Sequence, residues 1–353
     1  MTVYRDSKRI VGTNADRIGT PAISGGWKEL ARTTLGSAGD TISVSSLPDK
    51  RYYMILGHIE NTGGDTVSHV RANSDSSANY ALRRSVNAGA DSTTTSDNRL
   101  FSTHNSKSID SRFIQGYVAN KSDKEKLGIF QVNENPSTGA GTAPSRIEGV
   151  GKHVQTSSAL NELQLFNDEA GSFDTGGELV VLGWDPDDTH TTNFWEQLAD
   201  VTLSSASDTL SSGTITAKKY LWVQTYTKAT GGTVEPDSRF NGDSGTNYAD
   251  RYSINGGSDG TGTSISQGVR GSGVAYRALF NDFIINNASN EKLVIRNVVY
   301  PTASGAGNAP SRRETVGKWA NTSNQITSID WVDNSGSGAQ MDTDSFIKVW
   351  GSN

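Results

Sequence analysis

Cysteine is absent from this sequence of 353 residues, and long apolar stretches are absent as well. The chain therefore has no disulfide bonds, and even half of this length does not need them, because a domain of that size buries about two thirds of its unfolded surface on folding. The absence of cysteine fits synthesis in a reducing cytoplasm. No apolar run reaches the length that crosses a bilayer, and the first 20 residues lack the apolar core of a signal peptide. We therefore expect no membrane partner.

An excess of positive charge is also missing. The formal net charge is −6, and basic residues alternate with acidic ones along the chain, which argues against a nucleic-acid-binding groove. The exception is the segment 1–23, where four basic residues face two acidic ones. We interpret it as an N-terminal arm in which Arg9-Ile10-Val11 adds to the sheet edge of a neighbour. A loosely held terminus is the alternative.

The most informative feature is a repeat. STGAGTAPSRIEGVGKH at 137–153 returns as ASGAGNAPSRRETVGKW at 303–319, an offset of 166. Three shorter segments return at an offset of 168: WKEL (27–30) as WEQL, RANSD (71–75) as RFNGD, and NYA (79–81) as NYA. The offset changes by two between Asp97 and Asn120. Two copies of this size indicate a tandem duplication rather than a solenoid, with domains at 24–188 and 189–353.

Periodicity predicts strands throughout both halves. The composition is poor in apolar residues (33%) and has 38 glycines, which suits short strands joined by turns. Strong strand patterns occur at 51–59, 127–132, 178–184, 219–226, 293–299 and 345–350, and weaker ones near 40–44, 67–73, 79–86, 112–119 and 160–166. Helix signals are confined to WKEL and WEQL. We predict an all-β fold: two tandem homologous β-sandwiches, jelly-roll-like, with about eight strands each and an N-terminal arm.

Many polar residues occupy the same place in both halves. The pairs are Asp40/Asp208, Lys50/Lys218, Arg71/Arg239, Asn73/Asn241, Asp75/Asp243, Asn79/Asn247, Arg83/Arg251, Ser85/Ser253, Asn87/Asn255, Asp91/Asp259, Arg146/Arg312, Glu148/Glu314 and Lys152/Lys318. A catalytic centre is seldom needed twice in one chain, whereas turns and ion pairs recur wherever the fold recurs. We therefore interpret these residues, and the repeated loop, as structural.

Candidate sites for metals and nucleotides are weak. The five histidines, His58, His69, His104, His153 and His190, are scattered, and His69 and His153 align with Asp237 and Trp319. Gly139-Ala140-Gly141 and Gly305-Ala306-Gly307 lack the Gly-Lys-Ser/Thr of a phosphate loop and are interpreted as turns. The segments 73–91 and 241–259 supply oxygen ligands for Ca²⁺ but lack EF-hand spacing, so hydrogen-bonded turns are the alternative. We expect no catalytic, cofactor or metal-binding residues.

Aromatic residues offer one further candidate site. Trp222, Trp319, Trp331 and Tyr300 of the second half align with Met54, His153, Leu165 and Glu134. They form either a sugar-binding platform in one domain only or part of its core, and their strand patterns favour the core. Glu148 and Glu314 lie beside Arg146 and Arg312, which indicates ion pairs rather than the opposed carboxylates of a glycosidase.

The combination WKELARTTLGSAGDTI (27–42), KRYYM (50–54), NYA (79–81) and APSR (143–146) resembles virion structural proteins of marine viruses and phages. The resemblance implies a capsid-shell, decoration or fibre component that is made in the host cytoplasm and resides in the virion. We therefore expect a non-enzymatic protein whose partners are further copies of itself and other virion proteins. The alternative is a carbohydrate-binding adhesin or receptor-binding protein, with glycans as its partners.

Overall fold

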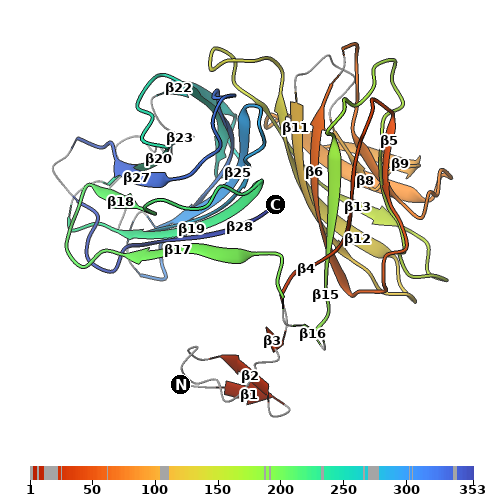
Figure 1. The fold of residues 1–353 in the computed structure, drawn as a ribbon, viewed down its shortest axis with the longest axis horizontal. Coiled ribbons are helices and arrows are strands. Elements are labelled where there is room, and N and C mark those ends of the chain that lie inside the picture. The colour runs from red at the N-terminus through yellow and green to blue at the C-terminus, as the bar shows by residue number, and fades with distance from the viewer. Residues whose placement is uncertain are drawn as a thin grey trace.

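Two β-sandwiches side by side make up most of the molecule (Figure 1). The computed structural model describes residues 3–5, 8–11, 23–24, 26–61, 63–103, 111–186, 188–190, 192–231, 234–264, 267–268, 278–301, 303, 305–336 and 340–353. All regular structure in these residues is antiparallel strand. None of them belongs to a helix of the length and hydrophobicity that a bilayer crossing requires. The predicted all-β fold with two tandem sandwiches is confirmed.

Sandwich 1 pairs a large sheet with a small one. The large sheet has the order β4 (Lys28–Thr34), β15 (Glu178–Trp184), β6 (Tyr52–Glu60), β11 (Ser111–Ala119), β12 (Lys126–Asn135), β13 (Ser145–His153), β8 (Tyr80–Val86) and β9 (Ser92–Asp97). The small sheet has the order β10 (Phe101–Ser102), β7 (His69–Ala72), β14 (Leu163–Phe166) and β5 (Thr41–Val44). Side chains alternate between the two faces of each strand, so every second residue of the large sheet points away from the small sheet.

Sandwich 2 repeats this topology. Its large sheet has the order β17 (Glu196–Thr202), β28 (Phe346–Ser352), β19 (Tyr220–Lys228), β24 (Ala278–Asn286), β25 (Lys292–Tyr300), β26 (Ser311–Trp319), β21 (Tyr248–Ile254) and β22 (Gly260–Ser264). Its small sheet, given in the same direction as that of sandwich 1, has the order β23 (Gln267–Gly268), β20 (Pro236–Phe240), β27 (Ile329–Asp333) and β18 (Thr209–Ser211). Strand order therefore matches between the halves, as a duplication requires. The domain boundaries at 24–188 and 189–353 stay predictions.

The change of offset occurs in two steps rather than one. The backbone amide of Asn120 donates to the carbonyl oxygen of Arg51, and that of Asn287 donates to Lys219, so these asparagines correspond at an offset of 167. The second half is thus one residue shorter than the first before the position of Asn120, and one residue shorter again between the positions of Asn120 and Lys126. The expected interval, Asp97 to Asn120, is therefore wrong for the second step.

Each sandwich encloses its own apolar core between its two sheets. In sandwich 1 the core includes Ile55, Val132 and Leu165, and in sandwich 2 it includes Val223, Val298 and Trp331. The ring of Phe101 lies against β11 and β12, where Gly116 and Gly128 leave room for it. Glycine is needed at both positions because an added Cβ would approach that ring within 2.6 Å and 2.4 Å.

Two expectations about secondary structure are wrong. The WKEL and WEQL segments enter the edge strands β4 and β17, which pair with β15 and β28, and not helices. Hydrogen bonding along a sheet edge outweighs a weak local preference for helix. The number of strands is also larger than expected, with 12 in each sandwich among the described residues, because short strands of two to four residues leave little periodicity in the sequence.

The N-terminal segment contains a small hairpin. Strand β1 (Val3–Arg5) pairs with β2 (Lys8–Val11), so Arg9-Ile10-Val11 lies in a strand that already has a partner within the arm. Strand β3 (Ile23–Ser24) pairs with β16 (Thr189–His190) of the connection between the sandwiches. The proposed addition of this arm to a neighbour stays a prediction.

Candidate binding surface

The outer face of the large sheet of sandwich 1 exposes a cluster of apolar side chains. We call this cluster the front patch; its members are Tyr52, Tyr117, Leu127, Ile129 and Val150. Ile129 lies opposite Tyr117 on one neighbouring strand and opposite Val150 on the other, so the patch is continuous across β11, β12 and β13. Only eight large apolar residues are exposed in the described part of the chain, and five of them are in this patch. Such clustering makes this face the candidate binding surface of the described part of the chain.

Two tryptophans border the front patch. The ring of Trp184 stacks on Tyr52 with centroids 5.3 Å apart, and the ring of Trp27 lies 5.9 Å from Tyr117 and 6.5 Å from Trp184. Together with the patch they line an open pocket of about 800 Å³, to which Arg83 and Lys152 also contribute. The pocket therefore combines a wide apolar floor with a few charged groups at its margin.

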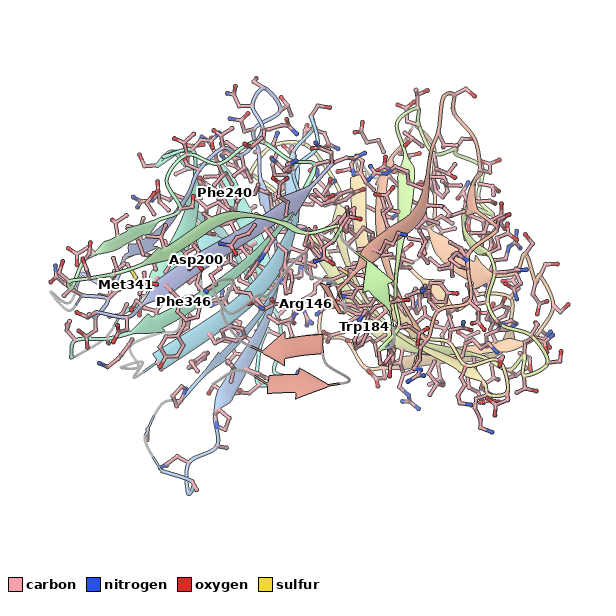
Figure 2. The ribbon with its side chains drawn as sticks, turned by 60° about the horizontal axis from the view of Figure 1, so that its bottom comes forward. Arg146, Trp184, Asp200, Phe240, Met341 and Phe346 are labelled. Atoms are coloured by element: carbon pink, nitrogen blue, oxygen red, sulfur yellow. The ribbon has the colours of Figure 1, made fainter. Side chains whose placement is uncertain are left out.

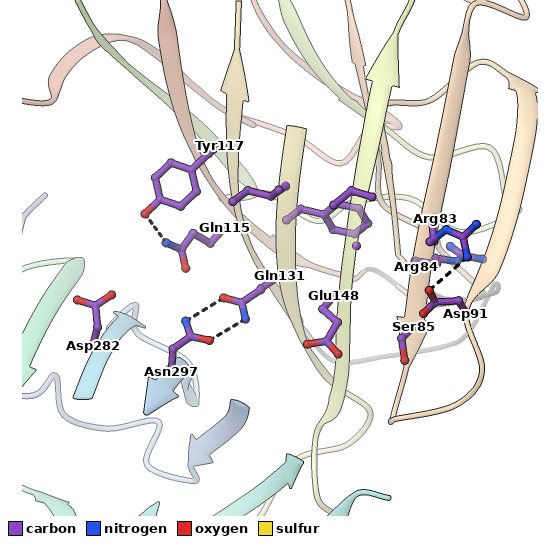
Figure 3. A pocket seen from close by; sticks show the side chains of 14 residues that line it. Arg83, Arg84, Ser85, Asp91, Gln115, Tyr117, Gln131, Glu148, Asp282 and Asn297 are labelled. Carbon is purple, nitrogen blue, oxygen red and sulfur yellow. Dashed lines mark hydrogen bonds and ion pairs between the residues drawn. The ribbon is translucent and has the colours of Figure 1, made fainter. Parts of the chain in front are cut away.

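A second, more polar pocket of about 520 Å³ adjoins the first and reaches sandwich 2 (Figure 3). Gln131 and Asn297 exchange amide hydrogen bonds of 3.1 and 3.2 Å across the gap between the sandwiches. Gln115 donates to the Tyr117 hydroxyl at 2.9 Å. Asp282 of sandwich 2 and Glu148 of sandwich 1 also line it.

Beyond these pockets the two sandwiches are packed against each other through a third apolar cluster. Sandwich 1 contributes Met54, Leu56, Phe113, Val180 and Leu182 from the outer face of its large sheet. Sandwich 2 contributes Phe194, Trp195, Tyr220, Ile284, Leu293, Ile295 and Val316. Buried apolar area of this kind holds the sandwiches together as one unit.

The repeated loop lies in this interface. We call residues 137–146 the docking loop, and its backbone accepts hydrogen bonds from three side chains of sandwich 2. Lys318 Nζ donates to the carbonyl oxygen of Ser137 at 2.6 Å, Arg251 Nε to that of Pro144 at 2.8 Å, and Thr263 Oγ1 to that of Ala140 at 2.9 Å. The loop amide of Gly139 donates to the carboxylate of Glu291.

An ion pair closes the far end of the docking loop. Arg146 is paired with Asp259 of sandwich 2 at 2.8 Å and with Glu148 of its own sandwich at 2.6 Å. The side chains of Arg146 and Asp259 are only 4% and 3% exposed. Figure 2 shows Arg146 where the two sandwiches meet. A charge-assisted pair that is buried this completely fixes the orientation of the groups that form it.

One row of residues across the large sheet of sandwich 1 completes the interface. The row runs Glu178, His58, Phe113, Asn133 and Arg146 through consecutive strand pairs. Tyr220 donates to Glu178 at 2.8 Å, and Asn286 lies 2.5 Å from His58 Nδ1. Asn133 donates to the carbonyl oxygens of Val294 and Gly317 at 2.9 and 2.7 Å. Every member of the row therefore touches sandwich 2.

The histidines do not form a site. His58 lies in the interface, His153 is stacked on Tyr80, and His69 is 3.3 Å from Asp168. Burial lowers the pKa of both His69 and His153. His104 lies outside the described residues, as does the side chain of His190. Within the described ranges no group of three or more histidine, aspartate or glutamate side chains is placed to hold a metal ion.

The two calcium candidate segments each begin with a hydrogen-bonded turn and continue into a strand, β8 or β21. Asn73 and Asn241 have φ near +55° and +53°, and their side-chain oxygens accept backbone amides, from Asn161 in the first half and Thr327 in the second. Asp75 accepts the amide of Ser77 at 2.9 Å. These oxygens are used by the fold, so we assign no metal site to 73–91 or 241–259.

The four aromatic residues of the second half do not form an exposed platform. Trp319, Trp331 and Tyr300 are buried in the core, and Trp222 is half-buried beside Trp350. Core packing, the favoured interpretation, is confirmed for the first three. Glu148 and Glu314 do pair with Arg146 and Arg312, as predicted. Gly139 and Gly305 have φ of +81° and +92°, which fits their interpretation as turn residues.

The interface and the front patch were missed by sequence reasoning. The signal for the interface was present, because Arg83/Arg251, Asp91/Asp259 and Lys152/Lys318 match between the halves but lie in no shared turn. The sequence alone predicts only a structural role for them. The front patch was hidden because Leu127, Ile129 and Val150 lie in strands, where apolar residues are expected to face a core.

No protein-family model matches the chain, and no curated protein matches it. Among solved structures it is similar to the LG1-3 region of the laminin alpha2 chain, at 9% identity and a TM-score of 0.20, with 88% of this chain and 64% of that chain covered. It is also similar to domains LG4-5 of the mouse laminin alpha1 chain, at 9% identity and a TM-score of 0.18, with 92% and 90% covered. TM-scores this low carry no argument about function.

Proposed function

We propose that this chain is a structural protein that performs no reaction and acts through self-assembly and protein–protein contacts. The observation that carries the proposal is the front patch, a continuous apolar surface on a rigid sheet with hydrogen-bonding groups at its margin. Monomeric proteins rarely expose such a patch, and protein–protein contact is its usual role. Fixing the two sandwiches through a buried interface gives a rigid unit suited to assembly.

The proposal is tested by measuring the mass of the purified protein in solution over a wide range of concentrations. Light scattering is expected to give a mass above the 37.6 kDa of one chain that grows with concentration. Electron microscopy of the same samples distinguishes shells, tubes and fibres from dispersed particles. A constant mass of one chain up to about 1 mM, where even a contact of −4 kcal/mol forms, would contradict self-assembly.

A virion role is the more specific part of the proposal. It is supported by the resemblance of the segments 27–42, 50–54, 79–81 and 143–146 to virion structural proteins. A capsid-shell, decoration or fibre component would each make use of a surface that binds other copies. Incorporation of the tagged protein into particles from infected host cells tests this part separately.

A glycan-binding module is the second candidate function, and the aromatic lining of the 800 Å³ pocket favours it. The exposed faces of Trp27, Tyr52, Tyr117 and Trp184 offer stacking surfaces for sugar rings, and Arg83 and Lys152 offer hydrogen-bond donors. Trp319 is buried and cannot serve this purpose.

Titration with algal polysaccharides separates the two candidates. Binding at millimolar or lower concentration that is lost in Trp184→Ala, with the fold retained, would support the glycan-binding module. Trp331→Phe, in the core, is the matched control for a change of aromatic residue elsewhere. Absence of binding in a glycan array, together with concentration-dependent assembly, supports the structural role.

A further inference from the structure

The front patch has a counterpart in sandwich 2, and that counterpart is covered. Strand register places Tyr52, Tyr117, Leu127, Ile129 and Val150 at the positions of Tyr220, Ile284, Leu293, Ile295 and Val316. All five residues of sandwich 2 are buried against sandwich 1. Leu127 is 56% exposed whereas Leu293 is fully buried, so the same place on the fold is a surface in one half and an interface in the other.

The polar groups around the front patch are repeated as well. Sandwich 2 holds the docking loop with Arg251, Asp259, Thr263, Glu291 and Lys318. The corresponding residues of sandwich 1 are Arg83, Asp91, Thr95, Glu125 and Lys152, identical at every position. The side chain of Lys152 is 43% exposed and that of Lys318 is fully buried. Sandwich 1 thus carries a complete set of loop-binding groups, and no hydrogen bond to them from a loop is seen among the described residues.

A copy of the docking loop lies exposed at the surface of sandwich 2. We call residues 303 and 305–312 the second loop. Gly305 repeats the positive φ of Gly139, and the loop is exposed at Ala306 and Pro310 where the docking loop is half-buried at Ala140 and buried at Pro144. Arg312 is 62% exposed where Arg146 is 4% exposed. Arg312 is paired with Glu314, as Arg146 is with Glu148.

The surface beside the second loop is apolar. The interface row of sandwich 1 corresponds in sandwich 2 to Phe346, Tyr226, Phe280 and Val299, followed by Arg312. We call the first four the rear patch. The rings of Tyr226 and Phe346 stack 5.9 Å apart, and Phe280 and Val299 account for two of the three exposed large apolar residues outside the front patch. Figure 2 shows Phe346 on sandwich 2 away from the contact with sandwich 1.

Differences between the halves are matched across the expected contact. In the interdomain interface His58 meets Asn286, two polar groups that hydrogen-bond. Their counterparts are Tyr226 on the rear patch and Ala119 beside the front patch, so both sides become less polar together. Arg312 retains the charge of Arg146, and Asp91 retains that of Asp259. At these positions the two exposed surfaces are therefore complementary in the way the two buried ones are.

We propose that the front patch of one chain binds the rear patch and second loop of another copy of this chain, repeating the interdomain interface between molecules. This inference rests on the proposed function, because it names the partner and the surfaces of self-assembly. The contact joins two different surfaces, so each chain keeps one of each free and assembly continues head to tail. Closed rings form if the rotation per subunit divides a full turn, and open filaments form otherwise.

Two single substitutions test the contact, each on an exposed side chain of one surface. Ile129→Glu places a charge in the front patch and Val299→Glu places one in the rear patch. Each variant alone is expected to associate at least about tenfold more weakly than the native chain, because a carboxylate without a partner is buried in the contact. Thr41→Glu, on the outer face of the small sheet, is the matched control and is expected to assemble normally.

Mixing the two variants gives the decisive result. The Ile129→Glu chain retains its rear patch and the Val299→Glu chain retains its front patch, so an equal mixture is expected to form dimers of twice the chain mass and nothing larger. If native protein assembles but Val299→Glu alone still forms dimers, or the mixture stays monomeric, the inference is wrong while self-assembly stands. If the native chain is monomeric at every concentration, both the inference and the proposed function are wrong.

Discussion

At the scale of single residues, the two halves use different side chains to make equivalent contacts. Asp75 accepts a hydrogen bond from the ring of His153 at 3.0 Å, and Asp243 accepts one from the ring of Trp319 at 2.7 Å. Both rings stack on the equivalent tyrosine, Tyr80 or Tyr248. His153 therefore has a structural role that tryptophan has in the other half, which explains why the two residue types differ at this position.

Asp75 gives the first prediction, a stability that depends on pH. Burial alone would raise the pKa of Asp75, but hydrogen bonds from Asn79, Ser77 and His153 outweigh it and lower the pKa to about 2. Because this pKa is lower in the folded chain, the stabilisation is present above about pH 4 and is lost as pH falls towards 2. Asp75→Asn is expected to cost about 1 kcal/mol at pH 7.

Urea unfolding of Asp75→Asn and the native chain at several pH values measures this effect. The difference in free energy of unfolding is expected to shrink between pH 4 and pH 2. Asp123→Asn, in an exposed pair with Lys121, is the control and should leave the unfolding curve unchanged. A difference for Asp75→Asn that stays constant down to pH 2 would show that its hydrogen bonds do not stabilise the ionised carboxylate.

The two lysines at one place on the fold give the second prediction. Lys318 is fully buried, 3.3 Å from Glu291 and hydrogen-bonded to Asn135 and Ser137, whereas Lys152 pairs with Glu125 on the surface. Lys318→Met leaves the carboxylate of Glu291 buried without its cation and is expected to destabilise the chain by about 3–5 kcal/mol. Lys152→Met is expected to change it by less than about 1 kcal/mol. Thermal unfolding of the dilute proteins compares them, and equal effects would contradict this account of the interface.

At the scale of elements, glycines that face the core allow neighbouring segments to approach the large sheet closely. In β13 a Cβ on Gly151 would lie 1.8 Å from the carbonyl oxygen of Leu100, a backbone atom that cannot move aside. Gly141, in the docking loop, has no atom within 4 Å of its Cβ position and no positive φ.

Alanine at these two glycines gives the third prediction. Gly151→Ala is expected to lower the free energy of unfolding by about 3 kcal/mol or more, because β13 and the segment at Leu100 have to separate. Gly141→Ala is expected to leave it within about 0.5 kcal/mol of the native value. Denaturant unfolding monitored by tryptophan fluorescence measures both. Similar stability for the two variants would mean that the sheet is not closely packed at Gly151.

Much of the element structure follows from local sequence, and the rest depends on distant partners. Residues 51–59 and 178–184 are continuous apolar runs, and both are central strands of the large sheet. The edge strand at Lys28–Thr34 carries no such pattern. One of its edges faces solvent, and the strand with which it pairs among the described residues, β15, is 144 to 155 positions away in the sequence (178 − 34 and 183 − 28). The turns at Asn73 and Asn241 were predictable from residue type, since asparagine tolerates positive φ.

At the scale of the whole molecule, the interdomain interface gives a role to the polar loop that occurs twice in the sequence. The docking loop holds the sandwiches together, and Arg251, Asp259 and Lys318 recognise it. Comparison of the halves identifies these residues as structural but does not reveal their interdomain contacts, because a repeat shows which residues are shared and not which surface they face. The second loop is the exposed counterpart of the docking loop, and the front patch is the exposed counterpart of the surface of sandwich 2 beside which the docking loop binds.

The most direct test uses the absence of cysteine. Thr263 and Ala140 touch in the interdomain interface, and Thr95 and Ala306 are their exposed counterparts. Thr95→Cys and Ala306→Cys are made as separate chains, mixed, and treated with a short bismaleimide crosslinker. One chain carrying both Ala140→Cys and Thr263→Cys is the internal control. Its crosslink joins two residues of the same chain and therefore gives no covalent dimer. The account predicts covalent dimers in the mixture and none in either single variant. Dimers in one variant alone, or none in the mixture while the internal control reacts, would contradict it.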